Sequence, residues 1–186
     1  RVKMLDIKIK CKFAYYPRED SELLQKAIEK FAFGKALDLG TGSGILGIAA
    51  AKRGCKVTFA DIDKKAIEEA KKNAKLNNVK GAFIVSDLFS NISGKFNTII
   101  FNPPYLYSKP IKELKEKRIY ALDGGIKGRE VINRFINEYI KHVEKEHIVL
   151  MLESSLNEYN KDILKLNAKV VESLDLFFEK LVVLKF

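Results

Sequence analysis

The sequence is poor in the residues from which metal sites, disulfides and histidine-based catalysis are built. It has 186 residues, with no tryptophan, two cysteines and two histidines. Cys11 and Cys55 stand alone, without the paired spacing of a zinc site or a redox motif, and are interpreted as small buried hydrophobic residues. His142 and His147 lie in or just after a charged helical stretch, which argues against a histidine metal site or a triad. We therefore expect no bound metal and look for the chemistry elsewhere.

The sequence also lacks a long apolar run. No stretch approaches the roughly 20 residues that cross a bilayer, and the amino end lacks the layout of a signal peptide. The content of 47% hydrophobic and 31% charged residues is typical of a folded globular chain. No repeat or linker divides it. We expect a single domain over residues 1–186, located in the cytoplasm and not in a membrane.

The charge is strongly positive, with a formal net charge of +10. Clustered lysines would indicate a nucleic-acid partner. Here the lysines are spread over most segments, as on the solvated surface of a hyperthermophile protein. The densest basic stretch, residues 109–118, also contains two glutamates. We expect this stretch, which belongs to the loop 105–127, to form a rim with some capacity to steer an acidic partner, and we keep nucleic acid as the second choice.

Apolar runs and helical periodicity alternate along the chain. Residues 4–15 alternate like a strand or hairpin, and acids precede the helix predicted over residues 17–31. Further strands are predicted over residues 35–40, 56–61, 81–87, 96–102, 147–153, 169–177 and 181–186, and further helices over residues 45–53, 64–76, 129–146 and 159–166. Strands that alternate with helices predict an α/β fold with a mostly parallel sheet covered on both faces. The last two strands predict an antiparallel hairpin at one edge.

A glycine loop, "DLGTGSGILG", joins the first buried strand to its helix. Its glycines allow a tight turn and a close approach of the backbone to a ligand, and they also satisfy the dinucleotide pattern of a nicotinamide enzyme. Asp61 ends the second strand, where an acid can accept the hydroxyls of a ribose. Asp87 ends the third strand, where it can receive an adenine amino group next to Leu88. Each acid alone is equally a helix cap or a turn residue.

Asp38 precedes the first glycine and distinguishes between the two candidate cofactors, a dinucleotide and S-adenosylmethionine. A carboxylate repels the pyrophosphate of a dinucleotide, whereas it attracts the ammonium and the sulfonium of S-adenosylmethionine. The sequence therefore favours S-adenosylmethionine.

The stretch "FNTIIFNPPYLYS" ends a strand in an asparagine, two prolines and a tyrosine. Pro103 and Pro104 cannot continue the hydrogen-bond ladder, and they fix the backbone after Asn102. One interpretation is a rigid turn. The other is a preset group of hydrogen-bond acceptors beside the ring of Tyr105, which would hold a planar NH2 group.

Together, "DLGTGSG", Asp61, Asp87 and "NPPY" resemble the class I S-adenosylmethionine-dependent methyltransferases, whose fold is a Rossmann-like seven-stranded sheet. "YYPREDSELL" and "ALDGGIKG" are similar to segments of the short archaeal and eukaryotic branch of the HemK-like protein-(glutamine-N5) methyltransferases. Position 21 is a serine where that family often has threonine. The serine keeps the hydroxyl group. The resemblance covers most of the chain.

This resemblance implies an enzyme that methylates a protein glutamine, that of the Gly-Gly-Gln tripeptide in a translation termination factor; lysine methylation is another activity of the branch. An adenine N6 amino group of RNA or DNA fits the same geometry and stays the alternative. The implied catalytic residues are Asn102, Pro103, Pro104 and Tyr105. The implied cofactor-binding residues are Ser21, Asp38, Gly40, Gly42, Asp61, Asp87, Leu88 and Asn102. Residues 1–33 are expected to extend over the cofactor site.

The resemblance also implies the strand order 3-2-1-4-5-7-6, which places residues 81–87 at an edge of the sheet. This edge is short and uncharged, and uncharged edges tend to pair with another strand. In the branch that the chain resembles, a small zinc-binding activator protein adds to this edge. We therefore expect a heterodimer; the alternative is that a loop or the amino-terminal strand covers the edge.

Overall fold

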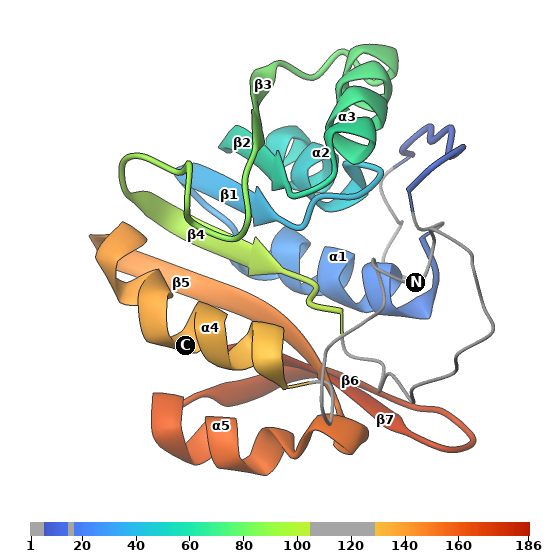
Figure 1. Ribbon diagram of the computed structural model, residues 1–186. Helices are drawn as coiled ribbons and strands as arrows, with labels where there is room; N and C mark the ends of the chain where they lie inside the picture. The colour runs from blue at the N-terminus through green and yellow to red at the C-terminus, as the bar shows by residue number, and fades with distance from the viewer. Residues whose placement is uncertain (1–5, 15–16, 105–128) are drawn as a thin grey trace, which may run out of the picture.

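The computed structural model describes residues 6–14, 17–104 and 129–186, which form a seven-stranded sheet between two layers of helices (Figure 1). The strands are β1 (Lys35–Leu39), β2 (Lys56–Asp61), β3 (Gly81–Val85), β4 (Phe96–Phe101), β5 (Val143–Ser154), β6 (Lys169–Asp175) and β7 (Lys180–Lys185). The helices are α1 (Glu19–Phe31), α2 (Ile45–Lys52), α3 (Lys64–Leu76), α4 (Glu130–Glu138) and α5 (Tyr159–Leu166). Two short 3-10 turns, η3 (Tyr139–His142) and η4 (Ser155–Asn157), flank β5.

The strand order is β3-β2-β1-β4-β5-β7-β6. Neighbours pair in parallel from β3 to β5, whereas β7 is antiparallel to both β5 and β6. This confirms the α/β class, the strand order and the antiparallel hairpin expected from the sequence. Because the parallel strands all end at one edge of the sheet, that edge gathers the polar residues that follow β1, β2, β3 and β4.

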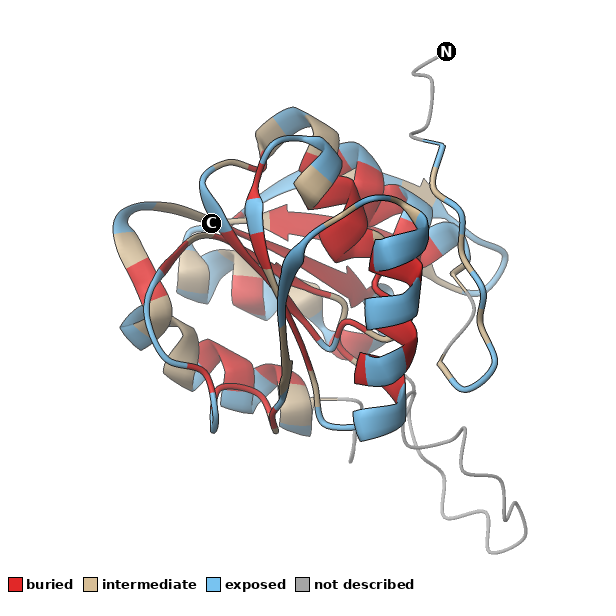
Figure 2. Cartoon of the chain, turned by 90° about the horizontal axis from the view of Figure 1, so that it is seen from above, coloured by how far each residue is buried: buried red, intermediate tan, exposed pale blue. Residues whose placement is uncertain are grey.

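The sheet separates two hydrophobic clusters. On one face, α1 and α2 pack on side chains that include Ile100 and Leu150. On the other face, α4 packs on side chains that include Phe101 and Met151. Neighbouring residues of one strand thus serve opposite cores, as the two-residue period of a strand requires. Figure 2 shows buried residues concentrated in the central strands and in the helix faces turned toward them.

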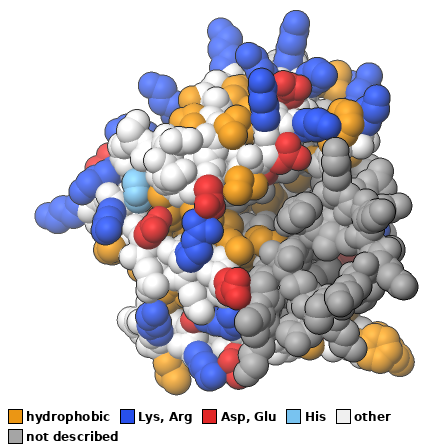
Figure 3. Space-filling view, viewed as in Figure 1, with side chains coloured by type: hydrophobic (Ala, Val, Ile, Leu, Met, Phe, Trp, Pro, Cys, Tyr) orange, Lys and Arg blue, Asp and Glu red, His pale blue; other side chains and the backbone are white. Residues whose placement is uncertain are grey.

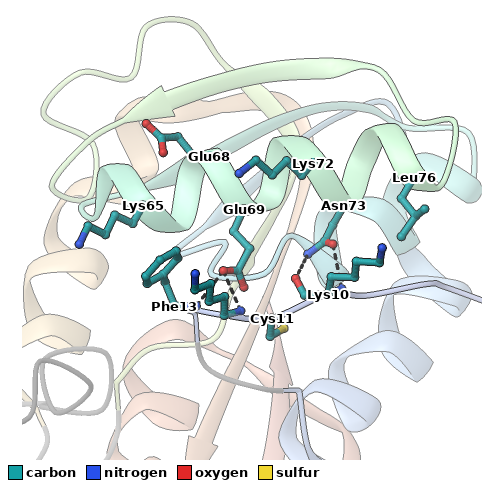
Figure 4. A pocket seen from close by; sticks show the side chains of 10 residues that line it. Lys10, Cys11, Phe13, Lys65, Glu68, Glu69, Lys72, Asn73 and Leu76 are labelled. Atoms are coloured by element: carbon teal, nitrogen blue, oxygen red, sulfur yellow. Dashed lines mark hydrogen bonds between the residues drawn. The ribbon is translucent and has the colours of Figure 1, made fainter.

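The amino-terminal segment corrects one prediction. Within the expected strand or hairpin over residues 4–15, the described residues 6–14 form no strand. Their backbone instead bonds to side chains of α3: the Lys10 N–H donates to Asn73 Oδ1 (2.9 Å), and the N–H groups of Lys12 and Phe13 donate to Glu69 Oε2 (3.0 and 2.8 Å). Figure 4 shows Glu69 and Asn73 directed from α3 toward this segment. Both residues line a cleft of about 400 Å³ that is also lined by lysines. The alternating apolar residues are real, but a helix supplies the hydrogen-bond partners.

The boundary before β5 corrects a second prediction. The helix expected over residues 129–146 ends as α4 at Glu138, and β5 begins at Val143 instead of residue 147. Val143 is buried and pairs with Phe96 of β4, ahead of a register irregularity between Phe96 and Thr98. The Asn97 side chain donates to the Glu146 carbonyl at 3.1 Å, which holds the irregular part of the strand. Burial and backbone pairing here override the helical preference of a Lys/Glu-rich stretch.

None of the helices in the described part of the chain is long and apolar enough to cross a membrane.

The clamp on the amino-terminal segment gives a first prediction. Asn73 is 1% exposed, and it also donates to the carbonyls of Lys10 (3.1 Å) and Ser43 (2.9 Å). Asn73→Ala removes three hydrogen bonds, and we expect it to lower the free energy of unfolding by about 2–3 kcal/mol. Amide hydrogen exchange should accelerate at Lys10, whose N–H loses its acceptor. The exposed Lys71→Ala on the same helix is the control; unchanged exchange at Lys10 in Asn73→Ala would contradict the clamp.

Candidate active site

The ends of β1, β2 and β4 bring together most of the residues that the sequence singled out. Asp38 of β1 is paired in register with Ile100, two residues before Asn102. A Cβ atom built on Gly40 would lie 3.9 Å from the Asn102 carbonyl oxygen, so the glycine loop and the strand end face each other. The β1–β2 pairing places Asp61 beside the same loop. These residues form the candidate site at the carboxyl edge of the sheet.

The glycine loop is tied to the end of β2. The Thr41 N–H donates to the Ala60 carbonyl at 2.9 Å, and the Gly42 N–H donates to Asp61 Oδ2 at 2.9 Å. Gly42 has a φ of +52°, and nothing lies within 4 Å of a Cβ atom built on it. The left-handed backbone and the open space together allow a ligand to approach the main chain at this point.

Asp38 is a fully buried carboxylate at the centre of the site. Its Oδ2 accepts hydrogen bonds from the Thr41 hydroxyl (2.5 Å) and the Gly47 N–H (2.8 Å). Its Oδ1 is buried and has no partner among the described residues. Burial raises the pKa of Asp38 to about 6, against the hydrogen bonds from Thr41 and Gly47, which lower it. At neutral pH the site therefore presents a negative charge with one unused acceptor.

Asn102 is held by a residue that the sequence reading did not single out. Its Nδ2 donates to Asp20 Oδ2 at 3.0 Å, across 82 positions of the chain. Asp20 is 3% exposed in the first turn of α1, and its Oδ1 accepts from the Ser21 N–H at 2.7 Å. The Asn102 Oδ1 is left buried and without a partner among the described residues. Asp20 belongs to the "EDS" stretch. Acids in the first turn of a helix are ordinarily explained by the helix dipole, so the sequence offers no reason to expect a bond from Asp20 to Asn102.

The backbone after Asn102 turns away from the sheet at two prolines. Pro103 is buried and Pro104 is half-buried, and neither continues β4. Tyr105, the loop 105–127, the basic stretch 109–118 and the "ALDGGIKG" turn lie outside the described residues.

Asp61 sits where the sequence places it. Its Oδ1 accepts from the Asp63 N–H at 2.9 Å, while Oδ2 accepts from Gly42. Burial raises its pKa, although the backbone N–H groups of Asp63 and Gly42 act in the opposite direction. The Asp61 carbonyl accepts from the Ser86 N–H (2.8 Å), which brings the end of β3 to the same edge.

Asp87 follows β3, but its carboxylate is engaged with the opposite layer of helices. Its Oδ2 forms an ion pair with Arg134 of α4 at 2.9 Å, and its side chain is 46% exposed. Leu88 next to it is buried, with a φ of +45°. The pair stands at the edge of the site, and its adenine-binding role stays a prediction.

A second polar cluster, also missed from the sequence, fixes α4 next to the site. The Arg129 guanidinium bonds to both oxygens of Asp162 (2.6 and 2.9 Å) and to the Asn157 carbonyl (2.6 Å). Glu153, at the end of β5, is 0% exposed and lies 3.4 Å from Arg129. Burial, with the negative charge of Asp162 nearby, raises the pKa of Glu153, whereas the Arg129 guanidinium acts in the opposite direction. Its partners are far apart in sequence, so no local pattern signals it.

Among the described residues, no three His, Cys, Asp or Glu side chains are grouped so that they hold a metal ion.

Comparison with known proteins decides the family. The profile of the methyltransferase small domain matches residues 18–121, more than half of the chain. A Methanocaldococcus jannaschii protein with the provisional name protein N5-glutamine methyltransferase is 40% identical over 176 residues, 91% of this chain and 89% of its own length. The chain belongs to the methyltransferase small-domain family. This confirms the resemblance to HemK-like enzymes: the chain is a methyltransferase, and its cofactor is S-adenosylmethionine.

Two further similarities bear on fold and substrate. Ribosomal RNA small subunit methyltransferase C of Haemophilus influenzae is 37% identical over 123 residues, which are 62% of this chain and 37% of that protein. The solved Mtq2–Trm112 complex of E. cuniculi, described as responsible for methylation of the translation termination factor eRF1, contains a chain of the same fold. It superposes with a TM-score of 0.72 at 23% identity and covers 92% of this chain and 96% of that chain.

The residues of the site fit this cofactor. A buried carboxylate with a free oxygen suits a cation, and Asp38 supplies it. The open backbone at Gly42 suits close contact with a ligand, and Asp61 retains lone pairs for hydroxyl groups. Among the described residues, no Lys or Arg side chain bonds to Asp38 or Asp61.

The raised pKa of Asp38 gives a second prediction. Its pKa of about 6 lies above the ordinary value of 3.8 for an aspartate, so the folded chain holds this proton up to higher pH than the unfolded chain does. A cationic cofactor needs the ionised form. We expect the affinity for S-adenosylmethionine to rise about tenfold from pH 5 to pH 7 as Asp38 ionises. Calorimetric titration at pH 5, 6 and 7 measures this rise.

Asp38→Asn should bind weakly and lose most of this dependence. Asp63→Asn, which changes an exposed carboxylate at the start of α3, should keep it. An identical pH dependence in Asp38→Asn and the unmodified chain would show that another group titrates.

Proposed function

We propose that the chain transfers the methyl group of S-adenosylmethionine to the side-chain amide nitrogen of a protein glutamine, with release of S-adenosylhomocysteine and loss of the amide proton to water after the transfer. We propose a translation termination factor as the substrate. The observation that carries the proposal is the Asn102 Oδ1, a buried acceptor without a partner among the described residues, on a backbone fixed by two prolines. The name of the Methanocaldococcus jannaschii relative and the description of the E. cuniculi complex support the substrate.

The geometry suits a planar NH2 group. Such a group has two N–H donors. Residues 102–104, which we call the elbow, offer two acceptors, the Asn102 Oδ1 and the Pro103 carbonyl. When both N–H groups are engaged, the nitrogen is held with one face free and electron density is drawn toward it. Pro103 and Pro104 fix the backbone and Asp20 fixes the Asn102 amide, so the acceptors need no rearrangement. Tyr105 is proposed to pack on the plane of the substrate amide.

The remaining site residues are proposed to hold the cofactor, which supplies a methyl group made electrophilic by its sulfonium. Asp38, Gly40 and Ser21 would take its methionine part, which carries the ammonium. Asp61 and Gly42 would contact the ribose. Residues 1–33 would extend over this site. The adenine is assigned to Asp87 and Leu88. The Asp87 carboxylate would then either bind the adenine and Arg134 together or break its ion pair with Arg134.

An exocyclic amine of a nucleic-acid base is the second candidate. The similarity to the ribosomal RNA methyltransferase favours it, and the two acceptors of the elbow suit an adenine N6 amino group equally well.

Labelled S-adenosylmethionine distinguishes the two acceptors and is our third prediction. The chain is incubated separately with a termination factor and with ribosomal RNA. We expect label on the factor, located on the glutamine by mass spectrometry. Label on RNA alone would reverse the ranking of the two functions.

Two variants test the elbow within that assay. Asn102→Ala removes the acceptor, and we expect kcat to fall by about 100-fold or more. Asp20→Ala keeps the acceptor but frees its amide to rotate, so kcat should fall less, by about tenfold. The affinity for S-adenosylmethionine should change little in Asp20→Ala. The exposed Asn160→Ala on α5 is the matched control, and equal kcat in all four proteins would contradict the assigned role of the elbow.

The edge strand β3 supports a partner. Among the described strands it pairs only with β2, and its residues are uncharged and exposed or half-buried. Val85 is 41% exposed, and Ile62 next to the end of β2 is 66% exposed. We propose that a small zinc-binding activator protein adds to this edge and that the heterodimer acts in the cytoplasm.

The fourth prediction tests this edge. Val85→Lys should weaken the heterodimer about tenfold or more in sedimentation with the activator, because it places a charge in an apolar contact. The exposed Leu164→Ser on α5 should leave it unchanged. A chain that is monomeric and fully active alone, with no gain from an activator, would remove the proposal.

A further inference from the structure

Two phenylalanines stand almost fully exposed in the turn between β6 and β7. Phe177 is 92% and Phe178 is 87% exposed, and their rings pack edge to face with centroids 4.6 Å apart. Leu176 before them is 37% exposed, and Leu156 in η4, which contacts β7, is 57% exposed. We call residues 176–179 the hairpin tip. Apolar side chains gathered in this way mark an interaction surface more often than scattered ones do.

The hairpin tip projects from the same edge of the sheet as the candidate active site. β7 is antiparallel to β5, and Leu181 near its start pairs with Ser154 at the end of β5. β5 is in turn parallel to β4, with Met151 opposite Phe101. From ordinary strand spacing and rise, the tip lies roughly 10 Å to the side of β4 and roughly 15–20 Å beyond its end. Figure 1 shows the hairpin on the side where β4 ends, and Figure 3 shows hydrophobic side chains projecting there.

Hydrogen bonds fix the tip to the end of β5. The Leu176 N–H donates to the Glu179 carbonyl at 2.8 Å and closes the turn. The Ser154 hydroxyl donates to Glu179 Oε2 (2.5 Å), and the Lys180 N–H donates to Ser155 Oγ (3.0 Å). The phenylalanines are thus presented on a braced turn, so binding through them loses little backbone freedom.

The charges around the tip favour a protein over a nucleic acid. Asp175 and Glu179 flank the phenylalanines, with one ammonium, that of Lys180, 3.4 Å from Asp175. Counted over the described residues, a chain with a net charge of +10 thus carries more acid than base at this point, which would repel a phosphate backbone. The two rings are at 83° to each other, so they do not offer the parallel faces on which successive bases stack.

We propose that the hairpin tip docks the protein that carries the target glutamine, by binding an apolar patch beside the segment that enters the active site. This proposal rests on the proposed function. The elbow recognises an amide that every glutamine has, so selection of one glutamine requires contacts at a distance from it. A rigid pair of aromatic side chains on the same edge is suited to that task.

The fifth prediction separates docking from catalysis by two substrates, the folded termination factor and a short peptide of about seven residues around its target glutamine. At about 3.3 Å per residue the peptide, centred on the glutamine, extends roughly 10 Å to either side and falls short of the tip. For Phe177→Ser/Phe178→Ser we expect kcat/KM on the folded factor to fall about tenfold or more, through KM. On the peptide it should not change. Phe177→Leu/Phe178→Leu should restore most of the loss, because it retains apolar side chains.

Leu164→Ser is the matched control, since Leu164 is an apolar residue of α5 that is 85% exposed. It should affect the methylation of neither substrate.

An equal loss of kcat/KM on factor and peptide in the serine variant would show that the tip supports the site instead of docking, and no loss on either would remove the proposal. A serine variant that changes only RNA binding, or only the sedimentation of the chain alone, would assign the tip to nucleic acid or to a second copy. If the unmodified chain labels RNA and neither the factor nor the peptide, the proposed function fails first, and docking of a protein substrate fails with it.

Discussion

The hydrogen bond from the Asn102 amide to Asp20 is the constraint on which the site depends. An asparagine side chain carries its donor nitrogen and its acceptor oxygen on the two arms of one planar amide, so an anchor on the nitrogen determines where the oxygen points. Asp20 is itself fixed by the Ser21 N–H. The first turn of α1 therefore sets the orientation of the acceptor at the end of β4, and Pro103 and Pro104 keep the chain from following any other path.

The parallel sheet supplies the second half of the site. Because β1, β2 and β4 end side by side, a buried carboxylate, a glycine loop and the elbow come within reach of one ligand. The same burial that raises the pKa of Asp38 strengthens its attraction to a cation once it is ionised. In the proposed function, Asp38 and the glycine loop would hold the positively charged methyl carrier next to the elbow, which would hold the acceptor. The braced hairpin tip between β6 and β7 shares this edge, so the proposed chemistry and the proposed selection of the substrate lie on one side of the sheet.

Much of this arrangement is predictable from local sequence. Apolar runs predicted the strands of the sheet. The helix predicted over residues 159–166 has the same bounds as α5, Tyr159–Leu166. Asp38, Gly40, Gly42, Asp61 and Asn102 come together because strand ends and a glycine loop follow from short patterns. The failures are contacts between distant segments. The strand expected near the amino end lacks a strand partner because Glu69 and Asn73 of α3 take its backbone, and Asp20, Arg129 and the pairing of Asp87 with Arg134 depend on residues far along the chain.

The most direct measurement is a crystal structure of the chain with S-adenosylhomocysteine and a peptide that contains the target glutamine. The account predicts the glutamine amide nitrogen within about 2.8–3.2 Å of both the Asn102 Oδ1 and the Pro103 carbonyl oxygen. It also predicts that the Asn102 Nδ2 remains bonded to Asp20. A peptide amide bound elsewhere, or an Asn102 oxygen turned away from it into the protein, would contradict the account.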